Sequence, residues 1–146
     1  MQDKDILQFK DKYRVFSNFY PCIISLEGLN FSTLEHAYVA SKSKEFFFKR
    51  LISFLPAEKA GVARQRGRNI RLRSDWSNEL KLEIMTELCH QKYKQEFFRR
   101  ALVKTGSSYL EEGNFWHDNF WGNCLCSGCK DIKGQNNLGK IIMDLR

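Results

Sequence analysis

The chain has 146 residues, of which 42% are hydrophobic and 28% are charged, which is typical of one soluble globular domain. Its 24 Lys and Arg against 17 Asp and Glu give a formal net charge of +7, and its 12 Phe, 5 Tyr and 3 Trp exclude a disordered chain. No apolar run approaches the roughly 18 residues of a membrane helix, and the N-terminus lacks the apolar segment of a signal peptide. We therefore expect one cytoplasmic domain over residues 1–146, with no membrane partner.

The positive charge is concentrated in one part of the sequence. Between Lys42 and Arg73 there are ten basic and two acidic residues, whereas the rest of the chain has 14 basic and 15 acidic residues. A local excess of this kind indicates an anionic ligand that binds at one place.

The N-terminal part is predicted to form a hairpin followed by a helix. Apolar runs flank Glu27-Gly28, which is a turn signal. Ser32 is expected to cap the helix, with Glu35 at N3 completing a capping box.

Helices are predicted for most of the remaining chain. Pro56 suits the first turn of a helix over residues 57–60, and Ser74-Asp75 suits the cap of a longer one with apolar residues every four positions. Two more helices are expected over residues 97–105 and 138–145, separated by a long loop over residues 111–136. The predicted fold is therefore mainly α, an α+β domain with a minor N-terminal β element.

Three groups of residues could carry chemistry. The first combines Glu35 and His36 with the arginines of the basic stretch. Glu35, in a first helical turn, is favoured in its ionised form and suits a base or charge stabiliser; the alternative is that it only completes the cap. His36 alone is more typical of a packed or surface histidine. Arginines alternate from Arg64 to Arg73 and could bind a phosphate or pyrophosphate, coat a solvated surface or contact a nucleic-acid backbone.

The loop over residues 114–123 is the second group, with four aromatic residues around a single carboxylate, Asp118. Aromatic faces can stack on a base, and a carboxylate can bind a sugar hydroxyl or polarise water. A loop that folds over the core would have the same composition.

The third group contains His117, Cys124, Cys126 and Cys129. Cys126 and Cys129 have zinc-knuckle spacing, so a structural Cys₃His zinc site is one interpretation. The tight spacing of Cys124 and Cys126 and the lack of a second distant ligand pair favour the other, free thiols in a reducing compartment. The prediction is therefore that no metal and no cofactor is bound.

Several motifs in order along the chain resemble the NADAR family, also called YbiA-like. They are Phe16-Ser17-Asn18-Phe19, Thr33 to Tyr38, Arg66 to Trp76, Asp118 to Gly122, and Asn137-Leu138-Gly139. The resemblance implies a compact, largely helical domain that cleaves N-glycosidic bonds. Family substrates are ADP-ribosylated guanine in nucleic acid, where members act as partners of ADP-ribosylating toxins, or the phosphoribosylamino pyrimidines of early riboflavin biosynthesis.

The resemblance implies catalytic positions at Glu35 and Asp118. Together with the aromatic loop, it implies substrate contacts at Asn18, His36, Lys42, Arg66, Arg68, Trp76, Trp116, Trp121 and Gly122. The chain departs from the family where many members have Asp-Gly in place of Asn123-Cys124 and a glutamine in place of Val39. The departure at Asn123-Cys124 could alter substrate contacts in the loop. The departure at Val39 could alter the wall of the pocket.

The resulting hypothesis is a cofactor-free hydrolase. Glu35 acts as base or electrostatic stabiliser, Asp118 as a second carboxylate, and Trp116 or Trp121 stacks on the leaving base. The expected partner is a ribose-phosphate small molecule or ADP-ribosylated nucleic acid, with removal of ADP-ribose from guanine preferred over the riboflavin intermediates. A module that binds ADP-ribose or nucleic acid without turnover is the alternative from another class. The oligomeric state is left open.

Overall fold

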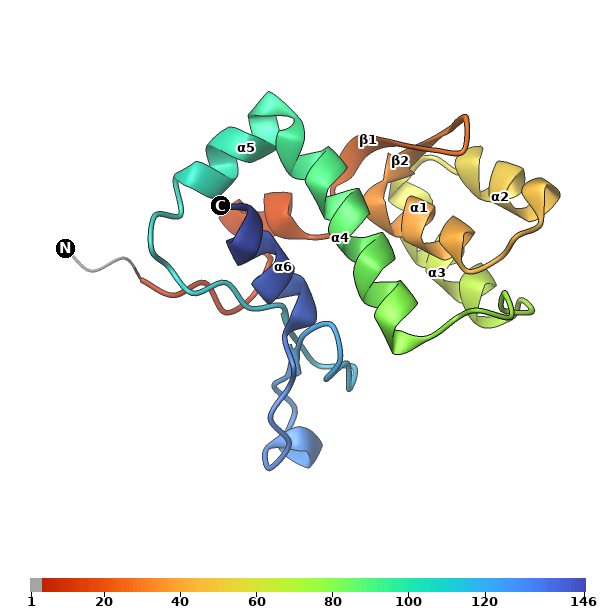
Figure 1. Ribbon diagram of the computed structural model, residues 1–146. Coiled ribbons are helices and arrows are strands. Elements are labelled where there is room, and N and C mark those ends of the chain that lie inside the picture. Colours follow the sequence, from red (N-terminus) through yellow and green to blue (C-terminus); the bar gives the residue numbers. More distant parts are fainter. Residues whose placement is uncertain (1–3) are drawn as a thin grey trace. The chain divides into compact units, whose positions relative to one another are not determined.

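The computed structural model describes residues 4–146, and the chain folds into two compact units (Figure 1). The hairpin unit comprises Asn18–Lys92. The terminal unit joins the N-terminal segment that ends at Ser17 to Tyr93–Arg146. Helices predominate and the sheets are small, which confirms the mainly α, α+β fold class. Whether the chain is one domain stays a prediction.

The hairpin unit begins with two antiparallel strands, β1 (Pro21–Leu26) and β2 (Leu29–Thr33). Glu27 and Gly28 connect them with φ values of 51° and 78°, as a tight hairpin turn requires. The predicted hairpin is therefore confirmed. In β1, Cys22 and Ile24 are buried and alternate with exposed residues, so one face of the hairpin joins the core.

Helix α1 (Leu34–Ser41) follows β2 directly, and all of its residues are buried. Thr33 caps it, since its Oγ1 accepts a hydrogen bond of 3.1 Å from the backbone N–H of His36. The predicted capping by Ser32 is wrong, because Ser32 still belongs to β2 and its hydroxyl donates to the Leu55 carbonyl at 2.8 Å. Glu35 therefore lies at the second helical position.

Three further helices complete the hairpin unit: α2 (Phe46–Ser53), α3 (Ala60–Arg68), which follows a 3₁₀ turn over Ala57–Lys59, and α4 (Asn78–Lys94), whose last two residues belong to the terminal unit. Sequence reasoning missed α2. The predicted start of α4 at Ser74-Asp75 is also wrong. Asp75 instead pairs with Arg73, and the hydroxyl of Ser77 accepts from the N–H of Leu80 at 3.1 Å.

Helix α1 is the centre of this unit, since it contacts the hairpin, α2 and α3. Helix α3 packs tightly against α1 at Gly67, where an added Cβ would lie 3.0 Å from Cγ1 of Val39. Val39 is itself fully buried. The expected departure from the family pattern at Val39 is thus part of the contact between the two helices.

The terminal unit contains the 3₁₀ helix η1 (Asp11–Phe16) and the helices α5 (Glu96–Val103) and α6 (Asn137–Leu145). The predicted helices in these two C-terminal regions are confirmed. An aromatic cluster forms part of the core, in which Tyr93 lies between Phe16 and Phe98 with ring centroids 6.4 and 6.5 Å away.

The loop between α5 and α6 carries a two-residue parallel pair, β3 (Gly113–Asn114) with β4 (Asn123–Cys124), and a 3₁₀ turn, η3 (Ser127–Cys129). Gly122 is required here, because a Cβ would lie 2.0 Å from the Glu112 carbonyl oxygen. Over residues 4–146, no helix is both long enough and apolar enough to span a bilayer.

Candidate functional site

Glu35 is a buried carboxylate with a fixed cationic partner. It is 5% exposed, its backbone N–H donates to the Asn18 carbonyl at 3.0 Å, and its Oε1 accepts from Nε of Arg64 at 3.1 Å. The Arg64 guanidinium also lies 4.6 Å from the ring centroid of Phe19. Residues from the start of the unit, α1 and α3 therefore hold this carboxylate in one orientation.

Lys42 adds a second cation to this group, which we call the Glu35 cluster (Glu35, Lys42, Arg64 and Arg68). Burial lowers the pKa of Lys42; the charge of Glu35 opposes this, and the charges of Lys81, Arg64 and Arg68 lower the pKa further. The charges of Lys81, Arg64 and Arg68 thus act on Lys42, as does the carboxylate of Glu35. Such a cluster has an unbalanced positive charge that an anionic ligand would neutralise.

An aromatic pair lies beside the cluster. Nζ of Lys42 lies 5.5 Å from the ring centroid of Tyr38, and that ring lies 5.8 Å from the ring of Trp76 at a tilt of 51°. Trp76 and Lys42, both expected to contact substrate, therefore share a common neighbour. Asn18, a third expected contact, is buried, and its side-chain amide lies 3.6 Å from the sulfur of Met85.

His36 is fully buried and holds the first turn of α1. Its Nδ1 shares a hydrogen bond of 2.6 Å with the hydroxyl of Thr33, which also accepts from its backbone N–H. Burial lowers the pKa of His36, and the backbone carbonyl of Pro56, as a hydrogen-bond acceptor for the ring, opposes the shift. The side chain acts as a neutral core group, and a direct contact between His36 and substrate stays a prediction.

The alternating arginines do not share one face, because Arg64, Arg66 and Arg68 lie on helix α3. Residues four apart share a helix face and residues two apart do not, so Arg64 and Arg68 belong together and Arg66 points elsewhere. Arg73 lies beyond the helix and forms a two-bonded pair with Asp75 at 2.6 and 2.9 Å. Sequence reasoning did not select Arg64 as a site residue, although its four-residue spacing from Arg68 was a usable signal.

Asp118 holds a turn in the terminal unit. Its Oδ1 accepts from the backbone N–H groups of Phe120 and Trp121 at 3.1 and 2.8 Å, so one of its two oxygens is used by the loop itself. Trp121 packs edge-on against Phe120, with centroids 4.8 Å apart, whereas Trp116 is 55% exposed. The catalytic role of Asp118 and base stacking by either tryptophan stay predictions.

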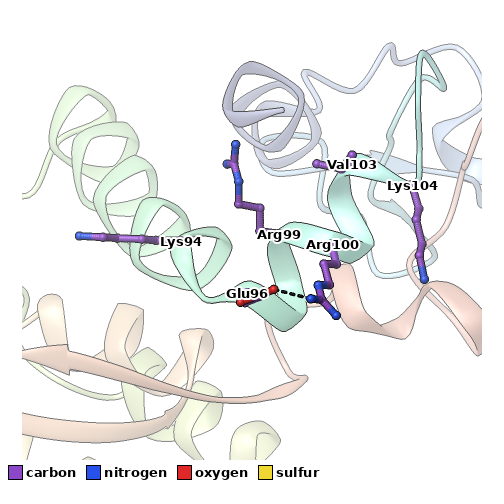
Figure 2. A pocket seen from close by; sticks show the side chains of 6 residues that line it. All are labelled: Lys94, Glu96, Arg99, Arg100, Val103 and Lys104. Carbon is purple, nitrogen blue, oxygen red and sulfur yellow. Dashed lines mark ion pairs between the residues drawn. The ribbon is translucent and has the colours of Figure 1, made fainter.

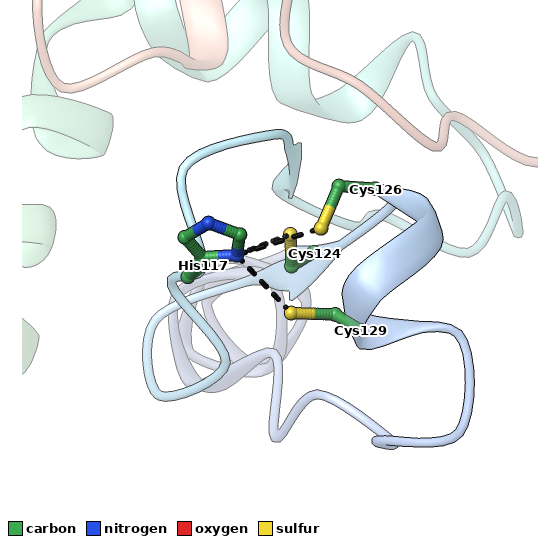
Figure 3. Close-up of side chains that lie close together, drawn as sticks. All are labelled: His117, Cys124, Cys126 and Cys129. Carbon is green, nitrogen blue, oxygen red and sulfur yellow. Dashed lines mark hydrogen bonds between the residues drawn. The ribbon is translucent and has the colours of Figure 1, made fainter.

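The four possible metal ligands of the same loop come together. Nδ1 of His117 lies 3.3, 3.9 and 3.4 Å from the sulfurs of Cys129, Cys124 and Cys126 (Figure 3). Burial raises the pKa of Cys124, but hydrogen bonds from Cys126, the His117 backbone and Cys129 lower it to about 7. Burial and the neighbouring thiols of Cys124 and Cys126 raise the pKa of Cys129 to about 11.

The terminal unit also has a basic hollow of about 510 Å³ along α5, lined by Lys94, Glu96, Arg99, Arg100, Val103 and Lys104. Arg100 pairs with Glu96 at 2.5 Å. Figure 2 shows that Lys94, Arg99 and Arg100 point in different directions. Because these cations do not converge on one point, the hollow lacks the geometry of an anion site.

Comparison with known proteins gives one family. A model described as the NADAR domain matches residues 6–146. The N-glycosidase Npun_R5314 of Nostoc punctiforme is 36% identical over 92% of this chain and 84% of its own length. The riboflavin biosynthesis protein VVA0006 of Vibrio vulnificus is 31% identical over 93% of this chain, which spans only 35% of that protein. The solution structure of Escherichia coli YbiA, a protein named N-glycosidase, matches all of this chain and 84% of its own, with 30% identity and a TM-score of 0.81.

Proposed function

The chain belongs to the NADAR domain family, and from this premise we propose that it hydrolyses an N-glycosidic bond between a phosphorylated ribose and a base. The observation that carries the proposal is the Glu35 cluster, a buried carboxylate held by Arg64 beside Lys42 and Arg68. The names of the Nostoc and Escherichia coli relatives support the same reaction class.

The cluster suits the charge changes of this reaction. Cleavage of an N-glycoside passes through an oxocarbenium-like state, whose positive charge a carboxylate stabilises. In the proposed mechanism, Glu35 faces the anomeric carbon and orients or deprotonates water. The carbon–nitrogen bond breaks, the hydroxyl of water adds to the carbon, and a proton goes to the departing base nitrogen. Arg64 keeps the carboxylate oriented, while Lys42 and Arg68 bind phosphate.

We propose ADP-ribosylated guanine in nucleic acid as the substrate. The cations of the Glu35 cluster can bind the two negative charges of its pyrophosphate. The second candidate is a phosphoribosylamino pyrimidine, which the name of the Vibrio relative favours.

The test compares wild type, Glu35→Gln and Glu83→Gln on both substrates side by side. Glu83 is an exposed glutamate on α4 and serves as the matched control. Loss of the carboxylate is expected to slow base release by about 100-fold or more, whereas the control keeps the wild-type rate. The measurement is the rate of release of free ADP-ribose or ribose 5-phosphate, with circular dichroism as the check on folding.

Two results would overturn the proposal. Undiminished release by a folded Glu35→Gln protein would remove Glu35 from the chemistry. Tight binding of ADP-ribose by wild type, without release from either substrate, would instead identify a binding module.

A further inference from the structure

Three cysteine thiols and one histidine imidazole, all of them possible metal ligands, come together in the loop between α5 and α6. His117 follows β3, Cys124 lies in β4, Cys126 precedes the 3₁₀ turn η3, and Cys129 is the last residue of that turn. Figure 3 shows the imidazole facing all three sulfurs. One ligand atom from each residue lies within 4.8 Å of every other. Of the chain's five cysteines, only Cys22 and Cys89 lie outside this group.

The distances fit a tetrahedral ion. Zinc–sulfur bonds of about 2.3 Å and zinc–nitrogen bonds of about 2.0 Å place nitrogen and sulfur about 3.5 Å apart at a tetrahedral centre. The three Nδ1-to-sulfur distances are 3.3, 3.4 and 3.9 Å. Tetrahedral zinc also requires sulfur–sulfur separations of about 3.8 Å. Because the ligand atoms lie within 4.8 Å of one another, shifts of up to about 1 Å would complete the coordination sphere.

The local backbone of the loop helps to arrange these side chains. His117 adopts the left-handed conformation with φ of 67°, which is uncommon for a residue other than glycine. The N–H of Cys129 donates to the Cys126 carbonyl at 3.1 Å and closes the turn between two ligands. Large apolar residues of this loop are exposed, namely Phe115, Trp116, Leu125 and Ile132. A loop that buries so little apolar surface is typical of segments that a metal or a disulfide cross-links.

We propose that His117, Cys124, Cys126 and Cys129 bind one zinc ion as a structural Cys₃His site. Three thiolates and an imidazole select a thiophilic metal over Mg²⁺ or Ca²⁺. Four protein ligands leave no open coordination position, so the ion stabilises the loop and does no chemistry on substrate. This proposal reverses the expectation of free thiols, and it does not depend on the proposed N-glycosidase activity.

The site has a direct consequence for Asp118. Asp118 follows His117 in the chain, and its carboxylate holds the turn that carries Phe120 and Trp121. An ion bound to His117 would anchor the residue next to this turn. Loss of the ion should therefore loosen the segment that contains the second expected carboxylate.

The experiment measures zinc in the full chain, purified under reducing conditions without chelator. The expected result is one zinc per chain by elemental analysis, released when an organomercurial reagent blocks the thiols. Cobalt added to the metal-free protein should give the strong visible absorption and sulfur-to-cobalt charge transfer of a tetrahedral thiolate site. Chelation should lower the Tm, since the binding free energy adds to folding free energy.

Matched variants separate this site from the other cysteines and histidines. Cys126→Ser and His117→Gln should lose the stoichiometric ion or weaken its binding at least tenfold, whereas Cys22→Ser and the exposed-residue change His90→Gln should retain it. Wild-type protein that is fully reduced and binds neither zinc nor cobalt would overturn the proposal. Equal metal loss in Cys22→Ser and Cys126→Ser, or a cobalt spectrum without sulfur ligation, would do so too. The wild-type measurements decide the question even if a ligand variant fails to fold.

Discussion

At the scale of single residues, Glu35 and Arg64 depend on each other. A buried carboxylate is costly unless a cation or hydrogen-bond donor faces it, and the Arg64 guanidinium fills that role while its own side chain is 31% exposed. Removing the cation leaves the carboxylate without its partner, whereas removing both charges leaves neutral groups. The effects of substituting the two residues on the free energy of unfolding should therefore be strongly non-additive.

We predict that Arg64→Gln lowers the free energy of unfolding by about 1–2 kcal/mol, a buried-pair value reduced for partial exposure. The double variant with Glu35→Gln should recover part of this loss, with a coupling energy of about 1 kcal/mol. Arg66→Gln, on another face of α3, should leave stability unchanged. These values are measured by urea unfolding of wild type, the two single variants, the double variant and the Arg66→Gln control. Simple additivity of the two single effects would contradict the assigned contact.

His36 gives a pH dependence whose sign follows from its burial. Its pKa in the folded state is lowered, so the unfolded chain binds more protons at mildly acidic pH. The stability that comes from neutral His36 is fully present above the unfolded pKa of about 6.5 and falls as the pH decreases below it.

We predict that the free energy of unfolding of wild type decreases between pH 7 and pH 5 more steeply than that of His36→Asn. The slope from this one group is at most about 1.4 kcal/mol per pH unit. The measurement is urea unfolding across that range. His90→Asn, at an exposed position of α4, is the control and should keep the wild-type slope. Parallel curves for all three proteins would exclude His36 as the titrating group.

At the scale of elements, the contact between α1 and α3 sets the distance between Glu35 and its cations. Gly67 permits that contact, since a Cβ there would lie 3.0 Å from Val39 and 3.6 Å from Cδ of Lys42. Gly61 lies on the same helix with open space around the position of a Cβ. The two glycines therefore form a natural comparison.

We predict that Gly61→Ala stabilises the protein by about 0.5 kcal/mol, since alanine favours a helix more than glycine does. Gly67→Ala should be less stable than Gly61→Ala, and Gly67→Val should lose about 1–3 kcal/mol through overpacking against Val39. Thermal and urea unfolding measure the order. Equal stabilisation by both alanine changes would contradict the close packing of the two helices.

The elements also show what sequence reasoning can reach. The hairpin and the two C-terminal helices depend on local signals, such as the Glu27-Gly28 turn, and these were predicted. Ser32 and Thr33 are equally good caps, and only the distant Leu55 carbonyl, which accepts from Ser32, assigns the cap to Thr33. Helix α2 was missed because three consecutive phenylalanines hide any helical period.

The residues of the candidate site were likewise predictable only where a local motif marks them. Glu35 was selected because a local motif marks it, and the structure shows it buried beside the charge-rich helix. Its partner Arg64 is 29 residues away, so no local pattern links the two side chains. The sequence interpretation of the alternating arginines did not consider the period of α3, which places Arg64 and Arg68 on one face and Arg66 on another.

At the scale of the whole molecule, the positive charge is less concentrated in the folded chain than in the sequence. The stretch from Lys42 to Arg73 has a large positive excess in sequence, but it shares the hairpin unit with most of the chain's glutamates. That unit has twelve basic and eight acidic residues, a net +4, and the terminal unit has the remaining +3. Within the basic stretch, Lys49, Arg64 and Arg73 are paired with carboxylates. No unit therefore has the strongly basic character of a general nucleic-acid binder.

We predict that unmodified duplex DNA binds weakly and that its affinity depends only modestly on the salt concentration. If the net charge of the hairpin unit limits the number of phosphates it neutralises, the slope of log affinity against log salt should be no steeper than about −4. A DNA-binding surface that used all of the unpaired basic residues would give a steeper slope. Fluorescence anisotropy of a labelled duplex in increasing KCl measures it, with Arg66→Gln and Arg68→Gln as probes of the two faces of α3. A slope near −7 for unmodified DNA would favour the nucleic-acid binding module, whereas a shallow slope with preference for ADP-ribosylated DNA fits recognition of the modified base.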